Sequence, residues 1–197
     1  MVDKKTIAFY DQASFDYAEK FAASKPDAQL RAFMAMLPER GHVLDLGCGP
    51  AFASAHMRTA GFTVDPVDAS KGMIETANAL HDINARLLRF DELDAVAAYD
   101  GVWANFSLLH APRADLPAHL AAIATALRPK GAFHVGLKRG TGTARDQIAR
   151  LYTYVTEDEL LDLLTTAGFA DFAIDHGEGA GMAGTVDPWI VIRARKT

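Results

Sequence analysis

Short apolar segments rich in valine, isoleucine and phenylalanine alternate along the chain with longer segments of helical period. This alternation predicts an α/β sheet whose strands are joined by crossover helices. Several of the apolar segments lack a polar face, as expected where helices cover both sides of a parallel sheet. The seven candidate strands are Val43–Leu46, Thr63–Val67, Ala85–Arg89, Gly101–Ala104, Ala132–Leu137, Ala170–Asp175 and Trp189–Ala194.

Helix ends can be recognised between these strands. Gly131 follows one helical stretch and Gly168 another, and glycine commonly ends a helix because it adopts the left-handed conformation. Thr156 and Glu159 fit a capping box at the start of the second stretch. The glycine-rich residues 177–184 are expected to form a mobile loop between the last two strands.

The N-terminal segment, residues 1–40, differs from the rest. It predicts two helices, over residues 11–22 and 27–37, and no strand. Aromatic residues, among them Tyr10 and Tyr17, lie close together in and beside the first helix. We therefore expect an N-terminal helical cap, which either packs against the sheet or acts as a lid over a ligand.

Composition narrows the functional classes. The 197 residues are expected to form one domain, 1–197, and the net charge of -5 argues against general affinity for nucleic acid. The single cysteine, Cys48, fits a reducing compartment. The scattered histidines show no metal-site spacing. With no signal peptide or membrane-length apolar run, we expect a cytoplasmic protein, monomeric or homodimeric.

A glycine-rich turn follows the first strand. Gly47 and Gly49 let the backbone approach a ligand, and the next helix presents unpaired N–H groups. Asp68 closes the following strand, where a carboxylate can accept hydrogen bonds from ribose hydroxyls. Phe52 would crowd a dinucleotide pyrophosphate, and Asp45 would repel it. A nucleotide-like ligand that carries a positive charge fits this turn better.

These features resemble those of the class I S-adenosylmethionine-dependent methyltransferases, in their small-molecule branch. The resemblance covers roughly residues 40–195 and rests on segments 43–51, 68–70 with Met73, 90–93, 105–110 and 127–131. It implies a Rossmann-like fold: a seven-stranded, mostly parallel sheet with an antiparallel last strand and helices on both faces. It also implies S-adenosylmethionine as the cofactor.

The resemblance further implies roles for individual residues. Gly47 and Gly49 would lie against the methionine portion of the cofactor, Asp68 would hold the ribose, and Arg89 stands where many relatives carry an acidic residue, so that Asp91 would substitute for it. The cofactor-binding residues expected in this way are Tyr10, Tyr17, Asp45, Gly47, Gly49, Asp68, Ala69, Met73, Phe90, Asp91 and Asn105.

Methyl transfer requires alignment more than proton chemistry, and a base only where the nucleophile arrives protonated. His110, after the fourth strand, is the candidate base, or else a loop histidine bonded to backbone. Lys138, Arg150, Tyr152 and Tyr154 would suit a small anionic or planar substrate, or else belong to a solvated helix face.

The sequence therefore predicts S-adenosylmethionine-dependent methyl transfer to a small-molecule acceptor, mainly by proximity and orientation. A nicotinamide-dependent oxidoreductase with an altered glycine turn is the alternative enzyme. A regulatory protein that binds the cofactor without turnover is the non-enzymatic alternative.

Overall fold

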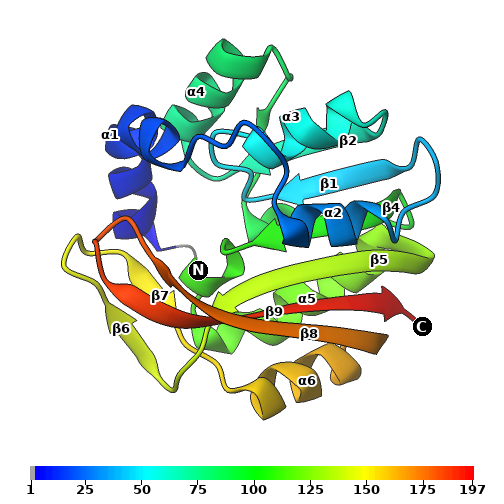
Figure 1. Cartoon of the computed structure of the whole chain (residues 1–197). Coiled ribbons are helices and arrows are strands. Elements are labelled where there is room, and N and C mark those ends of the chain that lie inside the picture. The colour runs from blue at the N-terminus through cyan, green and yellow to red at the C-terminus, as the bar shows by residue number, and fades with distance from the viewer. Residues whose placement is uncertain (1–2) are drawn as a thin grey trace.

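In the computed structural model, which describes residues 3–197, seven strands form one sheet in the order β3-β2-β1-β4-β5-β9-β8 (Figure 1). All neighbouring strands are parallel except β9, which runs antiparallel to both β5 and β8. The predicted Rossmann-like sheet with an antiparallel last strand is confirmed. The strands are β1 (His42–Leu46), β2 (Thr63–Asp68), β3 (Arg86–Leu87), β4 (Tyr99–Asn105), β5 (Leu127–Lys138), β8 (Phe169–Ala180) and β9 (Val186–Lys196).

Helices cover both faces of the sheet because successive side chains of a strand point to opposite sides. Val43 and Trp103 pack with α2 and α3, whereas Leu44 and Val102 pack with α5 and α6. None of the helices within residues 3–197 is long and apolar enough to cross a membrane. The helices are α1 (Lys4–Phe21), α2 (Ala28–Met34), α3 (Phe52–Thr59), α4 (Lys71–His81), α5 (Leu116–Ala126) and α6 (Glu157–Thr166).

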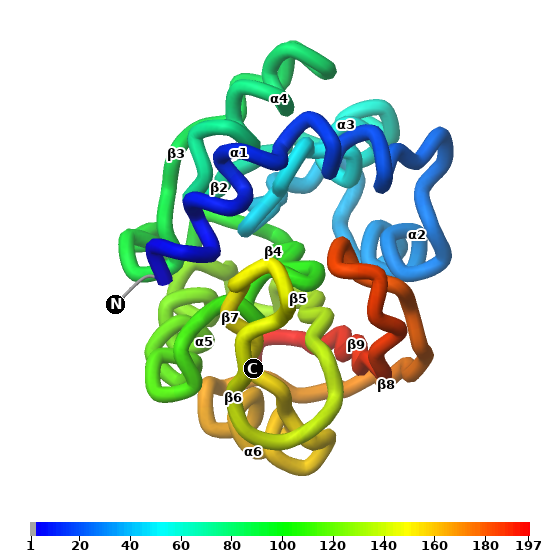
Figure 2. The backbone as a smooth tube through the Cα atoms, turned by 90° about the vertical axis from the view of Figure 1, so that its left-hand side faces the viewer, coloured from blue at the N-terminus to red at the C-terminus, as the bar shows by residue number. Residues whose placement is uncertain are grey.

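Helix α1 begins at Lys4, well before the predicted start at residue 11. Asp3 caps it, because its carboxylate accepts a hydrogen bond from the Thr6 N–H at 2.8 Å. The helix lies beside α4 (Figure 2). The contact requires glycine at position 72, since a Cβ there would lie 2.4 Å from the Asp11 carbonyl oxygen. The backbones of α1 and α4 thus come into close contact, which fixes the N-terminal cap against α4.

Two regions differ from the sequence expectations. The loop between the last two strands is shorter than the expected 177–184: β8 continues to Ala180, and β9 begins at Val186. The Trp189 ring of β9 packs over Gly177, where a Cβ would lie 2.2 Å from the ring. The segment after β5 is not helical but forms a separate hairpin of β6 (Thr143–Arg145) and β7 (Leu151–Thr153). This hairpin lies beside the start of α1 and therefore borders the functional site.

Candidate functional site

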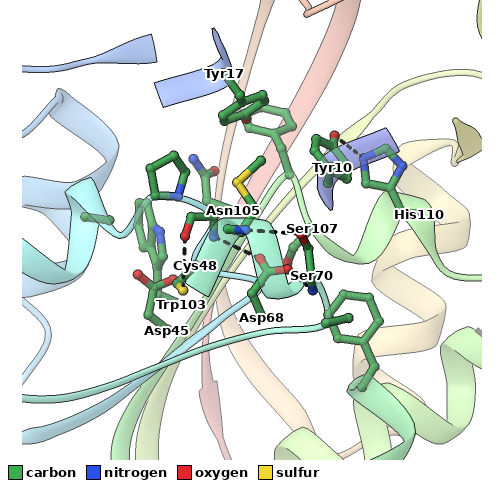
Figure 3. A pocket seen from close by; sticks show the side chains of 18 of the residues that line it. Tyr10, Tyr17, Asp45, Cys48, Asp68, Ser70, Trp103, Asn105, Ser107 and His110 are labelled. Atoms are coloured by element: carbon green, nitrogen blue, oxygen red, sulfur yellow. Dashed lines mark hydrogen bonds between the residues drawn. The ribbon is translucent and has the colours of Figure 1, made fainter. Parts of the chain in front are cut away.

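Beneath α1, the carboxyl ends of β1, β2 and β4 border a cavity of about 310 Å³, within the size range of small-molecule sites (Figure 3). The expected cofactor-binding residues all line it, and so does His110. Among the lining residues that the sequence did not single out are Leu30, His56, Trp103, Phe106 and Ser107. Within residues 3–197, no group of His, Cys, Asp and Glu side chains is arranged to hold a metal ion.

The glycine turn packs directly against the end of β4. Gly47 and Gly49 have φ angles of 79° and 54°, in the left-handed region that favours glycine. A Cβ at position 47 would lie 2.3 Å from the Ser107 Cβ. The Ser107 hydroxyl donates to the Leu46 carbonyl at 2.6 Å and so ties the two strand ends together. Because neither glycine has a side chain, their backbone atoms face the cavity directly.

Asp68 is held by the backbone on both of its oxygens. Oδ2 accepts from the Gly49 N–H and Oδ1 from the Ser70 N–H, each at 2.9 Å. Burial still raises the pKa of Asp68 above its usual value. Each carboxylate oxygen has a second lone pair, so Asp68 can also accept hydrogen bonds from ligand hydroxyl groups.

Asp45 is a buried carboxylate with no cationic partner among residues 3–197. Its side chain is 2% exposed, and it accepts one hydrogen bond, from the Ser54 hydroxyl at 2.6 Å. Burial raises its pKa to about 7, partly opposed by the bond from Ser54. A ligand with a positive charge would compensate this carboxylate.

The raised pKa of Asp45 predicts a pH effect on stability. The folded protein retains a proton that the unfolded chain releases above its ordinary pKa of 3.8, so stability falls as pH rises from about 4 through 7. The Asp45→Asn variant lacks this loss. We compare the free energies of unfolding of the variant and of wild type, both measured in urea. The variant's value minus the wild-type value should rise by about 2–3 kcal/mol as the pH goes from 5 to 7.5. Parallel pH profiles would contradict the assignment.

The short helix η1 (Phe90–Glu92) and α4 both border the cavity. The His119 ring packs edge-on against Phe90 at 5.7 Å between centroids. Arg89, which departs from the family pattern, pairs with Asp91 at 3.0 Å between Nε and Oδ1 and lowers its pKa. Asp91 is therefore an ionised hydrogen-bond acceptor that lines the cavity.

Three side chains, those of His110, Tyr10 and Arg150, form a chain of hydrogen bonds beside the cavity, and the direction of each bond is fixed. The Leu151 carbonyl can only accept, so His110 Nδ1 donates to it at 2.6 Å. His110 Nε2 must then accept from the Tyr10 hydroxyl at 2.8 Å (Figure 3). The Tyr10 oxygen in turn accepts from Arg150 at 2.7 Å. Burial lowers the pKa of His110 to about 4. Its role as a base stays a prediction, and it requires that Tyr10 first release Nε2.

The four residues expected on the substrate side do not line the cavity but lie behind Tyr10 and His110. The two cationic residues among them are paired within the protein: Arg150 with Asp146 at 2.7 Å, and Lys138 with Asp187 at 2.5 Å. Contact with a substrate stays a prediction for all of them. These residues are Lys138, Arg150, Tyr152 and Tyr154.

Comparisons with known proteins agree with this geometry. A family model described as "Methyltransferase domain" matches residues 43–131, which include the glycine turn, Asp68 and Asn105. The chain is 30% identical over 154 residues to trans-aconitate 2-methyltransferase of Deinococcus radiodurans, covering 76% of this chain and 57% of that protein. It is 30% identical over 112 residues to malonyl-[acyl-carrier protein] O-methyltransferase of Erwinia billingiae, covering 54% of this chain and 44% of that protein. The chain thus spans about half the length of the curated relatives it matches.

A solved structure matches over nearly the whole chain. It is the 1,6-didemethyltoxoflavin-N1-methyltransferase of Burkholderia thailandensis, with bound 1,6-didemethyltoxoflavin and S-adenosylhomocysteine. The TM-score is 0.73 at 26% identity, covering 98% of this chain and 88% of that one. Sheet order, glycine turn, acidic strand end and these relatives lead to one assignment. Residues 43–131 match a methyltransferase domain, and the whole chain has the fold of the class I S-adenosylmethionine-dependent methyltransferases.

Proposed function

We propose that this chain binds S-adenosylmethionine in the cavity and transfers its methyl group to a small molecule. The observation that carries the proposal is Asp45, a buried carboxylate without a cationic partner beside the glycine turn. The cofactor's amino group would supply the missing positive charge. Asp68 would accept the ribose hydroxyls, and Asp91 would accept from the adenine amine. A dinucleotide would instead bring its anionic pyrophosphate to the glycine turn, where Asp45 would repel it.

The protein's contribution to the reaction is positioning. When bound, the cofactor supplies an electrophilic methyl group on a sulfonium. Transfer would join the methyl carbon to a lone pair of the acceptor as the carbon–sulfur bond breaks, which would leave S-adenosylhomocysteine. The glycine turn and Asp68 fix the cofactor, and α1 covers the cavity against water. Alignment of this kind can supply roughly 7–11 kcal/mol.

A planar, uncharged acceptor fits the cavity better than a polyanion. Aromatic side chains line it at Tyr10, Tyr17 and Phe106. The nearby cations Lys138 and Arg150 are already neutralised by carboxylates. The solved relative from Burkholderia thailandensis carries 1,6-didemethyltoxoflavin together with S-adenosylhomocysteine. We therefore infer a nitrogen heterocycle as the acceptor class.

An assay of S-adenosylhomocysteine release tests this proposal. The purified chain is incubated with S-adenosylmethionine and either planar nitrogen heterocycles or small di- and tricarboxylates, as in trans-aconitate. We expect turnover with the heterocycles. Turnover with carboxylates alone would overturn the acceptor class but not the methyl transfer. Tight cofactor binding without turnover on either panel would favour the regulatory alternative.

We propose that α1 acts as a lid, because its Tyr10 and Tyr17 side chains line the cavity. The helix is held against α4 at Asp11 and also near both of its ends. Near its start, Asp3 pairs with Arg145 at 2.6 Å. Near its end, Lys20 donates to the Gly181 carbonyl at 3.3 Å and to the neighbouring Met182 carbonyl at 3.2 Å. Between these ends, the Tyr10 hydroxyl bonds to His110, which lines the cavity, and to Arg150.

The Tyr10→Phe variant tests the lid. It removes the hydroxyl that bonds to His110 and Arg150 but keeps the ring. Losing these bonds, at about 1 kcal/mol each, should speed S-adenosylhomocysteine dissociation about 5- to 30-fold in stopped-flow measurements. Phe15→Ala is the matched control, because Phe15 lies on the outer face of α1 and is 70% exposed. Equal dissociation rates for Tyr10→Phe and wild type would leave Tyr10 as a packing residue.

A further inference from the structure

His134 is a fully buried histidine on β5 that the proposed reaction does not use. Its ring stacks on the Trp103 indole, with centroids 3.7 Å apart and planes at 20°, and Phe33 packs edge-on at 6.1 Å. Nε2 lies 3.0 Å from the Oδ1 atom of Asn105. Nδ1 has no hydrogen-bond partner among residues 3–197. The ring therefore makes one polar contact, and that contact is to a residue that lines the cavity.

The contact fixes the protonation of the ring. Burial lowers the pKa of His134 well below its usual value, so the ring is neutral and carries one proton. A buried N–H without an acceptor is rarer and costlier than a buried lone pair without a donor. Because Nδ1 has no partner, the proton belongs on Nε2. His134 then donates, and Asn105 Oδ1 accepts.

Asn105 is thereby fixed in one orientation of its amide. Its Oδ1 rests against Gly136, where a Cβ would lie 2.6 Å away. With the carbonyl oxygen engaged by His134, the amide NH₂ group is the part of the side chain left for a ligand. Asp45 and Trp103 are paired in register between β1 and β4, so Asn105 lies beside Gly47 at the mouth of the turn (Figure 3).

We propose that His134 is a positioning residue that makes Asn105 a hydrogen-bond donor to the cofactor's carboxylate. The inference rests on the proposed function and deepens it. The amino-acid end of the cofactor carries one positive and one negative group. Asp45 matches the positive group, and the amide NH₂ of Asn105, next to the same turn, matches the negative one. An Asn105 whose carbonyl faced the cavity would repel that carboxylate.

Nitrogen-15 NMR of the full chain with labelled histidine tests the orientation without any ligand. The His134 signals are assigned by their loss in His134→Gln. We expect a neutral ring protonated on Nε2 at every pH from 5 to 8. A ring protonated on Nδ1, or one that titrates in this range, would overturn the assignment of Asn105 as a donor.

Calorimetry with two probes tests the role. S-adenosylhomocysteine has the amino-acid end, whereas 5′-methylthioadenosine lacks it. His134→Phe keeps a ring for Trp103 but has no donor, and His134→Gln restores an N–H near Nε2. We expect His134→Phe to weaken S-adenosylhomocysteine about tenfold, the loss of one oriented bond to a charged group, and to leave methylthioadenosine unchanged. His134→Gln should recover most of the affinity.

Three results would overturn the role: unchanged S-adenosylhomocysteine affinity in His134→Phe, equal weakening of both probes, or no recovery in His134→Gln. Urea unfolding of each variant confirms that the compared proteins are folded. If wild type binds neither probe, the proposed function fails, and the NMR result still decides how His134 and Asn105 are oriented.

Discussion

The Gly47→Ala variant is expected to lose about 2–4 kcal/mol of unfolding free energy and nearly all binding of S-adenosylhomocysteine. Two costs combine at this position. A φ of 79° is unfavourable for any residue with a Cβ, by about 1 kcal/mol. The added Cβ would also lie 2.3 Å from the Ser107 Cβ, and relief of such overpacking typically costs about 1–3 kcal/mol. Urea unfolding and calorimetry measure the two effects.

Gly61→Ala separates these costs. Gly61 also has a positive φ, 96°, but no atom lies within 4 Å of a Cβ placed there. This control should lose only about 1 kcal/mol and retain full affinity. Equal losses in the two variants would show that the close approach of Gly47 to β4 is unimportant.

The second large effect is expected at Arg150, whose guanidinium is buried between aromatic rings and a carboxylate. Its side chain is 3% exposed, and it donates to Asp146 and to the Tyr10 hydroxyl. Arg150→Leu leaves the Asp146 carboxylate buried without its partner. Breaking one side of such a pair costs about 3–5 kcal/mol, which urea unfolding should detect.

Arg145→Leu on the same hairpin is the matched control. Arg145 pairs with Asp3, but its side chain is 38% exposed, so this loss should stay below about 1 kcal/mol. The double variant Arg150→Leu with Asp146→Leu should recover part of the stability, because no lone charge remains. A loss at Arg150 no larger than that at Arg145 would contradict the buried ion pair.

The sequence predicts the central strands well and the edges poorly, for physical reasons. β1, β4 and β5 are buried on both faces, so their apolar runs identify them. β3 lies within the predicted strand 85–89 but contains only Arg86 and Leu87, both exposed. β6 was not predicted, because it is wholly exposed and requires no apolar pattern. The glycines near the end of β8 suggested a loop. Their role is to make room for the Trp189 ring of the neighbouring strand β9, and the local sequence does not show this contact.

The candidate site likewise has one part that the sequence predicts and another part that it does not. Asp45, the glycine turn and Asp68 lie at strand ends that a parallel sheet brings to one edge, so sequence spacing was enough to group them. The contacts of Tyr10 with His110 and Arg150 join residues 100 and 140 positions apart. His134 meets Asn105 only through the pairing of β4 with β5. Such contacts depend on tertiary structure, and no local pattern indicates them.

Calorimetric titration of the wild-type chain with S-adenosylhomocysteine and, separately, with NAD tests the central claim most directly. We predict binding of S-adenosylhomocysteine and no binding of NAD. In Asp68→Ala, the affinity should fall by about 1.5–3 kcal/mol, the scale of a lost hydrogen bond to a charged group. Binding of NAD alone would contradict the assignment of this cavity as a methyl-donor site.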